Sequence, residues 1–372
     1  MSKLTKYKFS DLYEMSSGIS SSKAQSGHGS PFVSFSTVFN NYFLPEELSD
    51  LMNTSIKEQE IYSVKKDDVF ITRTSETVDA LAMSCVAIKD YPKATFSGFV
   101  KRLRPKTTGI VYSKYIAFFL RSKYFRKVLD CNTIMTLRAS FNEDIFSFLY
   151  VYLPDYEEQV RIGDLLYKIE MKVRTNNKIN DNLEQQMHLI FEDMMAKATN
   201  NKIKGEFIVA KSLTQVITGK EDANFSVSNG KYKFFTCSNT PLHCDEYAFN
   251  SSSVLIAGNG DFNVKHYSGK FNAYQRTYVL SPQKEYYAIL YLAALYRINS
   301  FRTGSSGSIV KFITKSDVEN IPVFMPHDSK YLDELNKLVL MQEQNMLENE
   351  LLVQLRDWLL PMLMNGQATI SD

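Results

Sequence analysis

The side chains that could carry chemistry in this sequence are mainly cations and amides that follow short β-rich runs. Thr72 and Arg73 come directly after such a run at 69–71, and Asn259 follows a comparable run at 254–256. Arginine, asparagine and glutamine can read base edges, whereas lysine and small polar groups usually contact phosphates. The candidates for contact with DNA are Thr72, Arg73, Ser75, Lys101, Arg102 and Arg104 in the first half, and Asn259, Lys270, Gln275, Arg276 and Lys311 in the second. The alternative for each of them is ordinary solvated surface charge.

The sequence gives little support for a metal site, a phosphate-binding loop or a catalytic motif. Cys237, His243 and Cys244 lie close together, but their spacing matches no zinc finger or ribbon. The glycine-containing turns at 258–260 and 304–307 lack the Gly-Lys-Ser/Thr that follows in a phosphate-binding loop. The chain has no G-x-S-x-G or H-E-x-x-H motif and no Asn-Pro-Pro-aromatic tetrapeptide of the kind that adenine methyltransferases use. We therefore expect no catalytic residues, no metal site and no cofactor in this chain.

Two long helices are the clearest elements that could position the candidates. Apolar residues recur in alternating steps of four and three, which is the heptad pattern of a coiled coil. The first seam comprises Ile162, Leu166, Ile169, Val173, Asn176, Asn180, Leu183, Met187, Ile190 and Met194. The second comprises Tyr331, Leu335, Leu338, Gln342, Asn345, Asn349, Leu352, Arg356, Leu359 and Leu363. The first seam would be about 48 Å long at 1.5 Å per residue.

A pair of asparagines occupies the middle of each seam, Asn176 and Asn180 in the first and Asn345 and Asn349 in the second. Amides at seam positions fix register and partner at some cost in stability. If the helices run antiparallel within the chain, Asn176 faces Asn349 and Asn180 faces Asn345. The open alternative is that each helix pairs with a second copy of the chain.

The segments before the helices repeat each other more loosely. Each has a short β-rich run, then a helical pattern (112–129 and 286–299), then a strand that ends in proline, at Pro154 and Pro326. We expect an α+β fold with two mixed globular domains separated by two long helices that form an antiparallel coiled coil, an internal pseudo-two-fold duplication. The predicted boundaries are 1–153 for the first domain, 154–202 for the first helix, 203–327 for the second domain, and 328–372 for the second helix and tail.

Composition is consistent with a DNA-binding protein that also docks other proteins. The chain has 372 residues, 44% of them hydrophobic, and a formal net charge of +2. Cations are in excess in both predicted domains and anions in both helical segments. There is no signal-peptide pattern, the longest apolar stretch is too short to cross a membrane, and the four cysteines form no disulfide pattern. We therefore expect a cytoplasmic protein.

Two passages resemble the specificity subunits of type I restriction–modification systems. Residues 153–162, Leu-Pro-Asp-Tyr-Glu-Glu-Gln-Val-Arg-Ile, are similar to the P-x-x-E-Q start of that family's first long helix. Residues 355–367 are similar to the family's C-terminal ending, and Thr303–Gly307 is a weaker likeness. The second helix departs from the pattern, because 326–330 contain no Glu-Gln.

The resemblance implies a non-catalytic subunit that sets DNA sequence specificity. Each globular domain would be a target-recognition domain for one half of an asymmetric bipartite site on double-stranded DNA. The helices would set the spacing and dock two methyltransferase subunits, and restriction/translocase subunits would join the full complex. S-adenosylmethionine, ATP and Mg²⁺ are expected only in those partners. The alternatives are a coiled-coil scaffold without sequence-specific DNA binding and a standalone enzyme with an unrecognised site.

Overall fold

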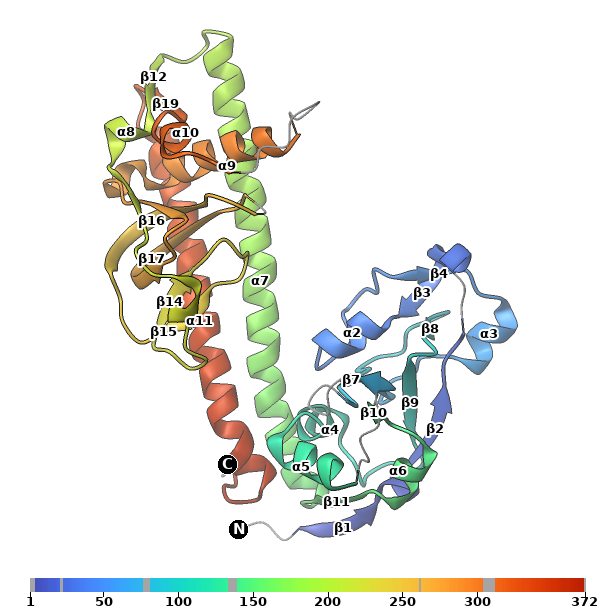
Figure 1. Ribbon diagram of the computed structural model, residues 1–372. Coiled ribbons are helices and arrows are strands. Elements are labelled where there is room, and N and C mark those ends of the chain that lie inside the picture. Colours follow the sequence, from blue (N-terminus) through green and yellow to red (C-terminus); the bar gives the residue numbers. More distant parts are fainter. Residues whose placement is uncertain are drawn as a thin grey trace. The chain divides into compact units, whose positions relative to one another are not determined.

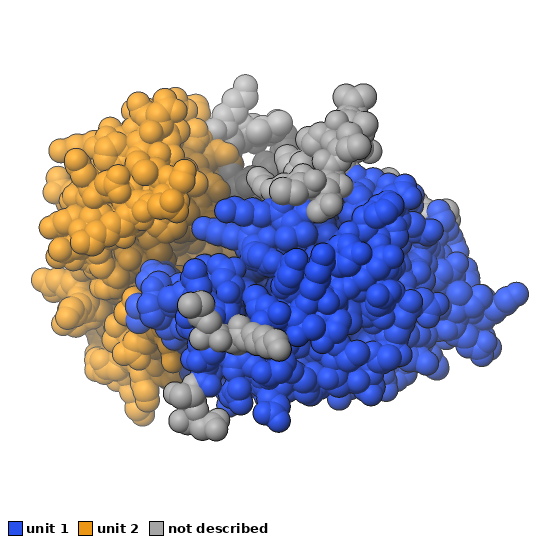
Figure 2. Space-filling view, turned by 90° about the horizontal axis from the view of Figure 1, so that it is seen from below, with its two compact units in different colours: residues 1–173, 350–372 blue, residues 174–349 orange. Residues whose placement is uncertain are grey.

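The computed structural model describes residues 4–20, 23–75, 81–132, 139–260, 262–303 and 312–370. The chain divides into two compact units, one formed by residues 1–173 with 350–372 and the other by residues 174–349 (Figure 2). Helices α7 (Tyr156–Thr199) and α11 (Lys330–Met364) each contribute one part to each unit. No helix within the described ranges is both long and apolar enough to span a membrane.

The first unit is built on a four-stranded antiparallel sheet. Its strand order is β2-β9-β5-β7, with β2 at Tyr13–Ser17, β9 at Val100–Pro105, β5 at Val69–Thr72 and β7 at Ser84–Val86. A second sheet has the order β4-β3-β8, with β4 at Leu51–Met52, β3 at Ser26–Val33 and β8 at Thr95–Phe96. Two pairs complete the strands, β1 (Thr5–Lys8) with β11 (Tyr150–Leu153) and β6 (Thr74–Ser75) with β10 (Ala139–Ser140).

The helices of the first unit are short apart from α7 and α11. They are α1 (Phe9–Leu12), α2 (Phe35–Asn40), α3 (Ile56–Ile61), α4 (Ser113–Phe119), α5 (Lys123–Asn132) and α6 (Glu143–Phe148), with a 3-10 turn at Lys23–Gln25. The helical pattern over 112–129 is thus two helices rather than one. The break has a local cause, because Ser122 Oγ donates to Phe119 O (2.7 Å) and accepts from Phe125 N (3.3 Å), ending one helix and capping the next.

The second unit is built on a six-stranded sheet. Its order is β13-β18-β16-β17-β14-β15, with β13 at Val216–Thr218, β18 at Thr277–Leu280, β16 at Phe249–Ala257, β17 at Val264–Ala273, β14 at Tyr232–Phe235 and β15 at Leu242–Cys244. A separate pair joins β12 (Gly205–Val209) to β19 (Pro322–Pro326). Helix α9 (Tyr287–Thr303) packs on β16 and β17 (Figure 1), and the shorter helices are α8 (Ala210–Leu213) and α10 (Lys315–Glu319). The 3-10 turns lie at Ala223–Phe225 and Lys284–Tyr286.

The strand orders confirm the predicted duplication. In each unit a strand and a four-residue helix begin the fold, and this strand pairs with the one that ends in proline. The order β2-β9-β5-β7 matches β13-β18-β16-β17, and β4-β3-β8 matches β15-β14-β17, with the same parallel and antiparallel pairings. Gly18 and Gly219 are equivalent as well, since a Cβ would lie 2.3 Å from Ser97 O in the first case and 2.0 Å from Ala273 O in the second.

The helices are part of the hydrophobic cores. In the first unit, Ile162 and Leu166 of α7 share a core with Leu360 and Leu363 of α11 and with the apolar residues of α4. In the second unit, α7 and α11 share a core with α9. Every predicted seam residue is buried or half-buried, which is the outcome that the heptad spacing predicts.

Candidate nucleic-acid interface

Two candidates of the first unit, one buried and one exposed, lie at the end of β5. Thr72 closes this strand and is fully buried, with its Oγ1 accepting a hydrogen bond from Met83 N (3.0 Å). Arg73 follows it and is exposed, and its N–H donates to the carbonyl oxygen of Phe99 (2.9 Å). Phe99 occupies the turn between β8 and β9, and its side chain is 67% exposed. We call Arg73 and Phe99 the first rim.

The other cations of the first unit lie on β9, where they hold the sheet together. Lys101 is buried and donates to Ser17 Oγ (2.8 Å), and burial, with the Arg73 charge as a second cause, lowers the pKa of this lysine. Arg102 is buried and donates to Ser63 O (2.6 Å). Arg104 forms a two-pronged ion pair with the buried Asp68, at 2.6 and 2.7 Å. These contacts leave little of the three side chains for a phosphate to reach.

The second unit presents its candidates at the equivalent end of its sheet. Gln275 and Arg276 are exposed in the turn between β17 and β18, and Asn259 is half-buried after β16. Phe312 pairs with Asn259 through a backbone bridge, and its side chain is 64% exposed. We call Asn259, Arg276 and Phe312 the second rim.

Backbone hydrogen bonds show that the two rims are the same place in the two domains. Arg73 N donates to Phe99 O, and Gly258 N donates to Arg276 O, both at 2.9 Å. A segment later in each domain bonds to this place in the same way. Phe141 N donates to Arg73 O, and Ile313 N donates to Gly258 O, both at 2.8 Å. Arg73 therefore corresponds to Gly258, Phe99 to Arg276 and Ser140 to Phe312.

Some predicted residues do not join the rims. Lys270 is exposed but lies opposite Asn250 in the β16–β17 ladder, at the far end of β16 from Asn259. Lys311 lies outside the described residues, and of Ser75 only the backbone, in β6, is described. Sequence reasoning missed Phe99 and Phe312, because neither phenylalanine belongs to a periodic apolar pattern. The one feature of the sequence that could have indicated them is that both lie near the ends of strands, and these strands occur in both halves of the chain.

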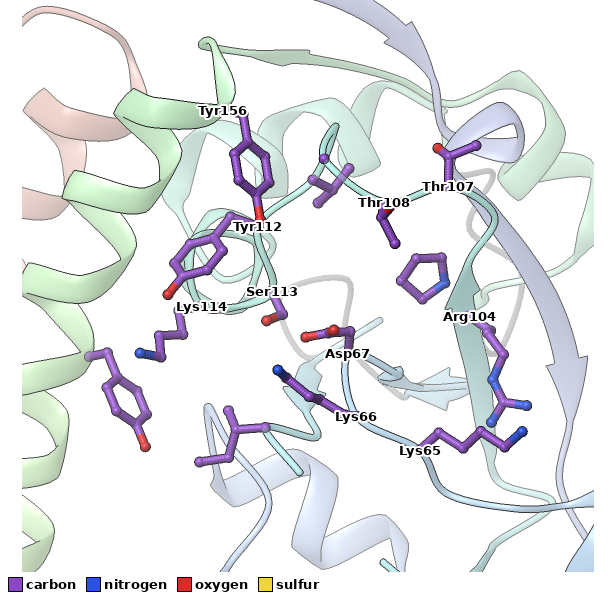
Figure 3. Close-up of a pocket in the computed structure, with 15 residues that line it drawn as sticks. Lys65, Lys66, Asp67, Arg104, Thr107, Thr108, Tyr112, Ser113, Lys114 and Tyr156 are labelled. Carbon is purple, nitrogen blue, oxygen red and sulfur yellow. The ribbon is translucent and has the colours of Figure 1, made fainter. Parts of the chain in front are cut away.

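A basic hollow of about 610 Å³ lies elsewhere in the first unit (Figure 3). In this view Lys65 and Arg104 lie on one side of it and Tyr112 and Lys114 on the other. Arg104 is paired with Asp68, and Lys114 is paired with Asp164 at 2.8 Å, so two of its cations are already neutralised. The hollow is therefore a weaker candidate for phosphate contact than the first rim.

The predicted asparagine pairing is confirmed within the second unit. Asn176 is fully buried, and its Nδ2 donates to Asn349 Oδ1 (2.9 Å) and to Glu348 Oε2 (2.7 Å). Asn345 Nδ2 donates to Asn180 Oδ1 (2.9 Å). Partner numbers fall along one helix as they rise along the other, so the helices are antiparallel and pair within one chain (Figure 1).

A buried polar network joins the second domain to both helices. His266 of β17 contacts Gln342 Oε1 through Nε2 (2.9 Å) and Glu343 Oε1 through Nδ1 (3.2 Å), both on α11. Tyr291 of α9 donates to Glu184 Oε1 of α7 (2.9 Å), and Gln342 Nε2 donates to the other oxygen of the same carboxylate (3.0 Å). Since a half-satisfied network would be costly, these bonds favour a single orientation of this domain on its part of the helix pair.

Comparison with known proteins agrees with this geometry. The family model of the type I restriction modification DNA specificity domain matches residues 1–185 and 204–349. The chain belongs to this family. Two matches in one chain fit the duplicated strand order, and the family resemblance inferred from the sequence is confirmed.

Individual relatives support the same family. The specificity subunit of the Escherichia coli type I restriction enzyme EcoDI is 37% identical over 164 residues, which cover 42% of this chain and 37% of that protein. The matching segment thus spans well under half of that relative's length. The crystal structure of the type I restriction–modification S subunit from M. genitalium has a TM-score of 0.64 at 14% identity, covering 97% of this chain and 96% of that one. At this identity the likeness shows a shared fold.

Proposed function

We propose that this chain is the DNA-specificity subunit of a type I restriction–modification complex and acts in the cytoplasm. Each domain reads one element of an asymmetric two-part site on duplex DNA. The observation that carries the proposal is the pair of rims, one place in a duplicated fold furnished with different side chains. Because the side chains differ, the two DNA elements differ too. The antiparallel helices would set the number of unread base pairs between them.

The proposed partners are methyltransferase subunits that dock on the helices. In the first unit, Leu351, Leu355 and Trp358 of α11 are exposed at spacings of four and three residues, which places them on one face. Trp358 is 65% exposed, and tryptophan is among the residues that contribute most to protein interfaces. We assign this face to a methyltransferase subunit, with restriction/translocase subunits joining later. Catalysis, S-adenosylmethionine, ATP and Mg²⁺ belong to those partners in this proposal.

The test is to purify the chain alone and with a type I methyltransferase subunit, and to assay both samples with duplex DNA and S-adenosylmethionine. We expect methyl transfer only when both proteins are present. DNA affinity of the complex should fall steeply as salt rises, because phosphate contacts release counterions. Trp358→Ala should weaken co-purification of the partner, whereas Phe148→Ala, which removes a similarly exposed aromatic from α6, should not.

The other two functions predict different results. A complex that forms but binds no DNA would support a coiled-coil scaffold and contradict the proposal. Turnover by the purified chain without any partner would instead indicate an enzyme. Membership in the specificity family does not favour either alternative.

A further inference from the structure

The two rims share an exposed aromatic ring as well as an exposed arginine. The exposed phenylalanines among the described residues are Phe99, Phe148, Phe207 and Phe312. Phe207 packs against Phe324, with ring centroids 5.2 Å apart. Of the other three, Phe99 and Phe312 lie in the rims, one in each domain.

We propose that Phe99 and Phe312 are specificity-determining residues, each making an apolar contact with the bases of one DNA element. This inference rests on the proposed function and names the side chains that carry it out. A single exposed apolar side chain needs no explanation on a protein surface. Here one ring recurs in each of two equivalent places, beside Arg73 in the first domain and in the same rim as Arg276 in the second.

The backbone that carries each ring is fixed by several hydrogen bonds. Phe99 N–H donates to Ser97 Oγ (3.2 Å), Phe99 O accepts from Arg73 N, and Val100 N closes the turn on Ser97 O (2.9 Å). Phe312 pairs with Asn259, and the next residue, Ile313, bonds to Gly258 and Tyr278. A backbone held in place before binding loses little conformational entropy when its side chain meets a ligand.

The chemistry of each rim suits duplex DNA. Arginine supplies a permanent cation with five donors for phosphate or guanine, and phenylalanine supplies apolar contact with a thymine methyl group or a base step. Near the first rim, Lys101 is buried against Ser17, so Arg73 is the exposed cation there, and Glu143 is a carboxylate close to that lysine. In the second rim the Asn259 amide adds a group that can bond adenine.

The two domains place the ring differently within the same rim. Phe99 occupies the turn position that Arg276 occupies in the second domain, and Phe312 occupies the position of Ser140 in the first. The ring and the guanidinium are thus rearranged between domains. This rearrangement would give each domain its own base preference without any change of fold.

The experiment uses the complete methyltransferase complex with Phe99→Ala, Phe312→Ala and Phe148→Ala. Methylated sites are sequenced in a DNA library in which the wild-type target has been randomised one position at a time. We expect Phe99→Ala to reduce discrimination about tenfold at one or two positions of one element, and Phe312→Ala to do so in the other element. Phe148→Ala, the matched control, should leave both elements unchanged.

The outcomes separate this inference from the proposed function. Wild-type discrimination in both variants, or a uniform loss for every sequence, would overturn the base contacts while leaving the specificity subunit intact. Changes in the same element for both variants would also overturn them. A wild-type complex that methylates no defined site would instead contradict the proposed function. Melting temperatures check folding, and Phe99→Ser and Phe312→Ser replace any alanine variant that fails to fold.

Discussion

Asn176 is one of two asparagines at the centre of a seam whose other members are apolar, and its side chain is fully buried. Its donor hydrogens are used by Asn349 and Glu348 on the opposite helix. A leucine there would bury more apolar surface, but it could pair with a leucine at several registers. The Asn176–Asn349 pair, which we call the asparagine layer, therefore lowers the stability somewhat but favours one register and one partner.

Replacing one member of this layer should cost more than replacing both. Asn176→Leu removes the donor that the half-buried Asn349 carbonyl and the Glu348 carboxylate share, so the free energy of unfolding should fall by about 1–3 kcal/mol. Adding Asn349→Leu should recover much of this loss by forming an apolar layer, while promoting self-association. Urea unfolding and light scattering measure the two effects.

Asn182→Leu is the matched control, because Asn182 is exposed on α7. It should change stability by less than about 0.5 kcal/mol. A double variant that loses the full sum of the two single losses would contradict the role given to the layer.

Lys265 on β17 makes stability depend on pH in a direction that can be tested. Burial lowers the pKa of this lysine to about 8, with a nearby Cys237 opposing the shift. Between pH 8 and the ordinary lysine pKa of 10.5, the unfolded chain holds more protons than the folded one. The free energy of unfolding therefore gains a contribution that rises with pH across this window.

Comparing the wild type with Lys265→Met isolates this contribution, since tyrosine ionisation cancels in the difference. The stability of the wild type relative to the variant should increase from pH 8 to pH 10.5 and stay flat between pH 6 and pH 7. Urea unfolding at each pH measures it. A difference that is constant over the whole range would contradict a lowered pKa.

Arg73 and Arg276 can be sorted into phosphate and base contacts by mutation to alanine. Loss of a phosphate contact should weaken binding to all DNA sequences alike. It should also reduce the slope of log affinity against log salt concentration by about one. Loss of a base contact should relax one position of one element. Lys270→Ala is the control, because Lys270 lies at the other end of the strand pair. Equal effects of all three variants would contradict the assignment of binding to the rims.

At the scale of elements, the helices were the most predictable part of the molecule. Heptad spacing is a local property, so the seams could be read from the sequence alone, and Pro154 marked the start of α7. The burial of Lys101 and Arg102 could not be read in this way. It depends on β9 pairing with β2 and β5, whose residues are distant in the sequence. The rims were hidden for the same reason.

Lengthening both helices should widen the unread gap in the DNA site. Seven residues inserted after Val173 in α7 and seven after Asn349 in α11 would face each other in the antiparallel pair and preserve both seams. The insertion adds about 10 Å, or about three base pairs. Both DNA elements should keep their sequences, as mapped by sequencing of methylated sites.

A single insertion is the control for the double one. Seven residues added to α7 alone would prevent the Asn176–Asn349 and Glu170–Arg356 contacts from forming at the same time, so the complex should lose stability or activity. A changed element sequence after the double insertion would contradict the spacer role of the helices.

At the scale of the whole molecule, duplication was predictable in outline and its detail was not. Strands that end in proline before each long helix suggested the repeat, and the matching sheet orders confirm it. The equivalence of Phe99 with Arg276 needed the backbone hydrogen bonds, because no sequence likeness links the two turns. The two domains therefore share a backbone framework, and their functional difference lies in the side chains of the two rims.

The most direct measurement is a map of the methylated sites that the complete wild-type complex leaves on genomic DNA. Two different rims in one chain predict one asymmetric motif, made of two short defined elements separated by a fixed number of unspecified base pairs. A continuous motif, or two identical elements in a palindrome, would contradict the account.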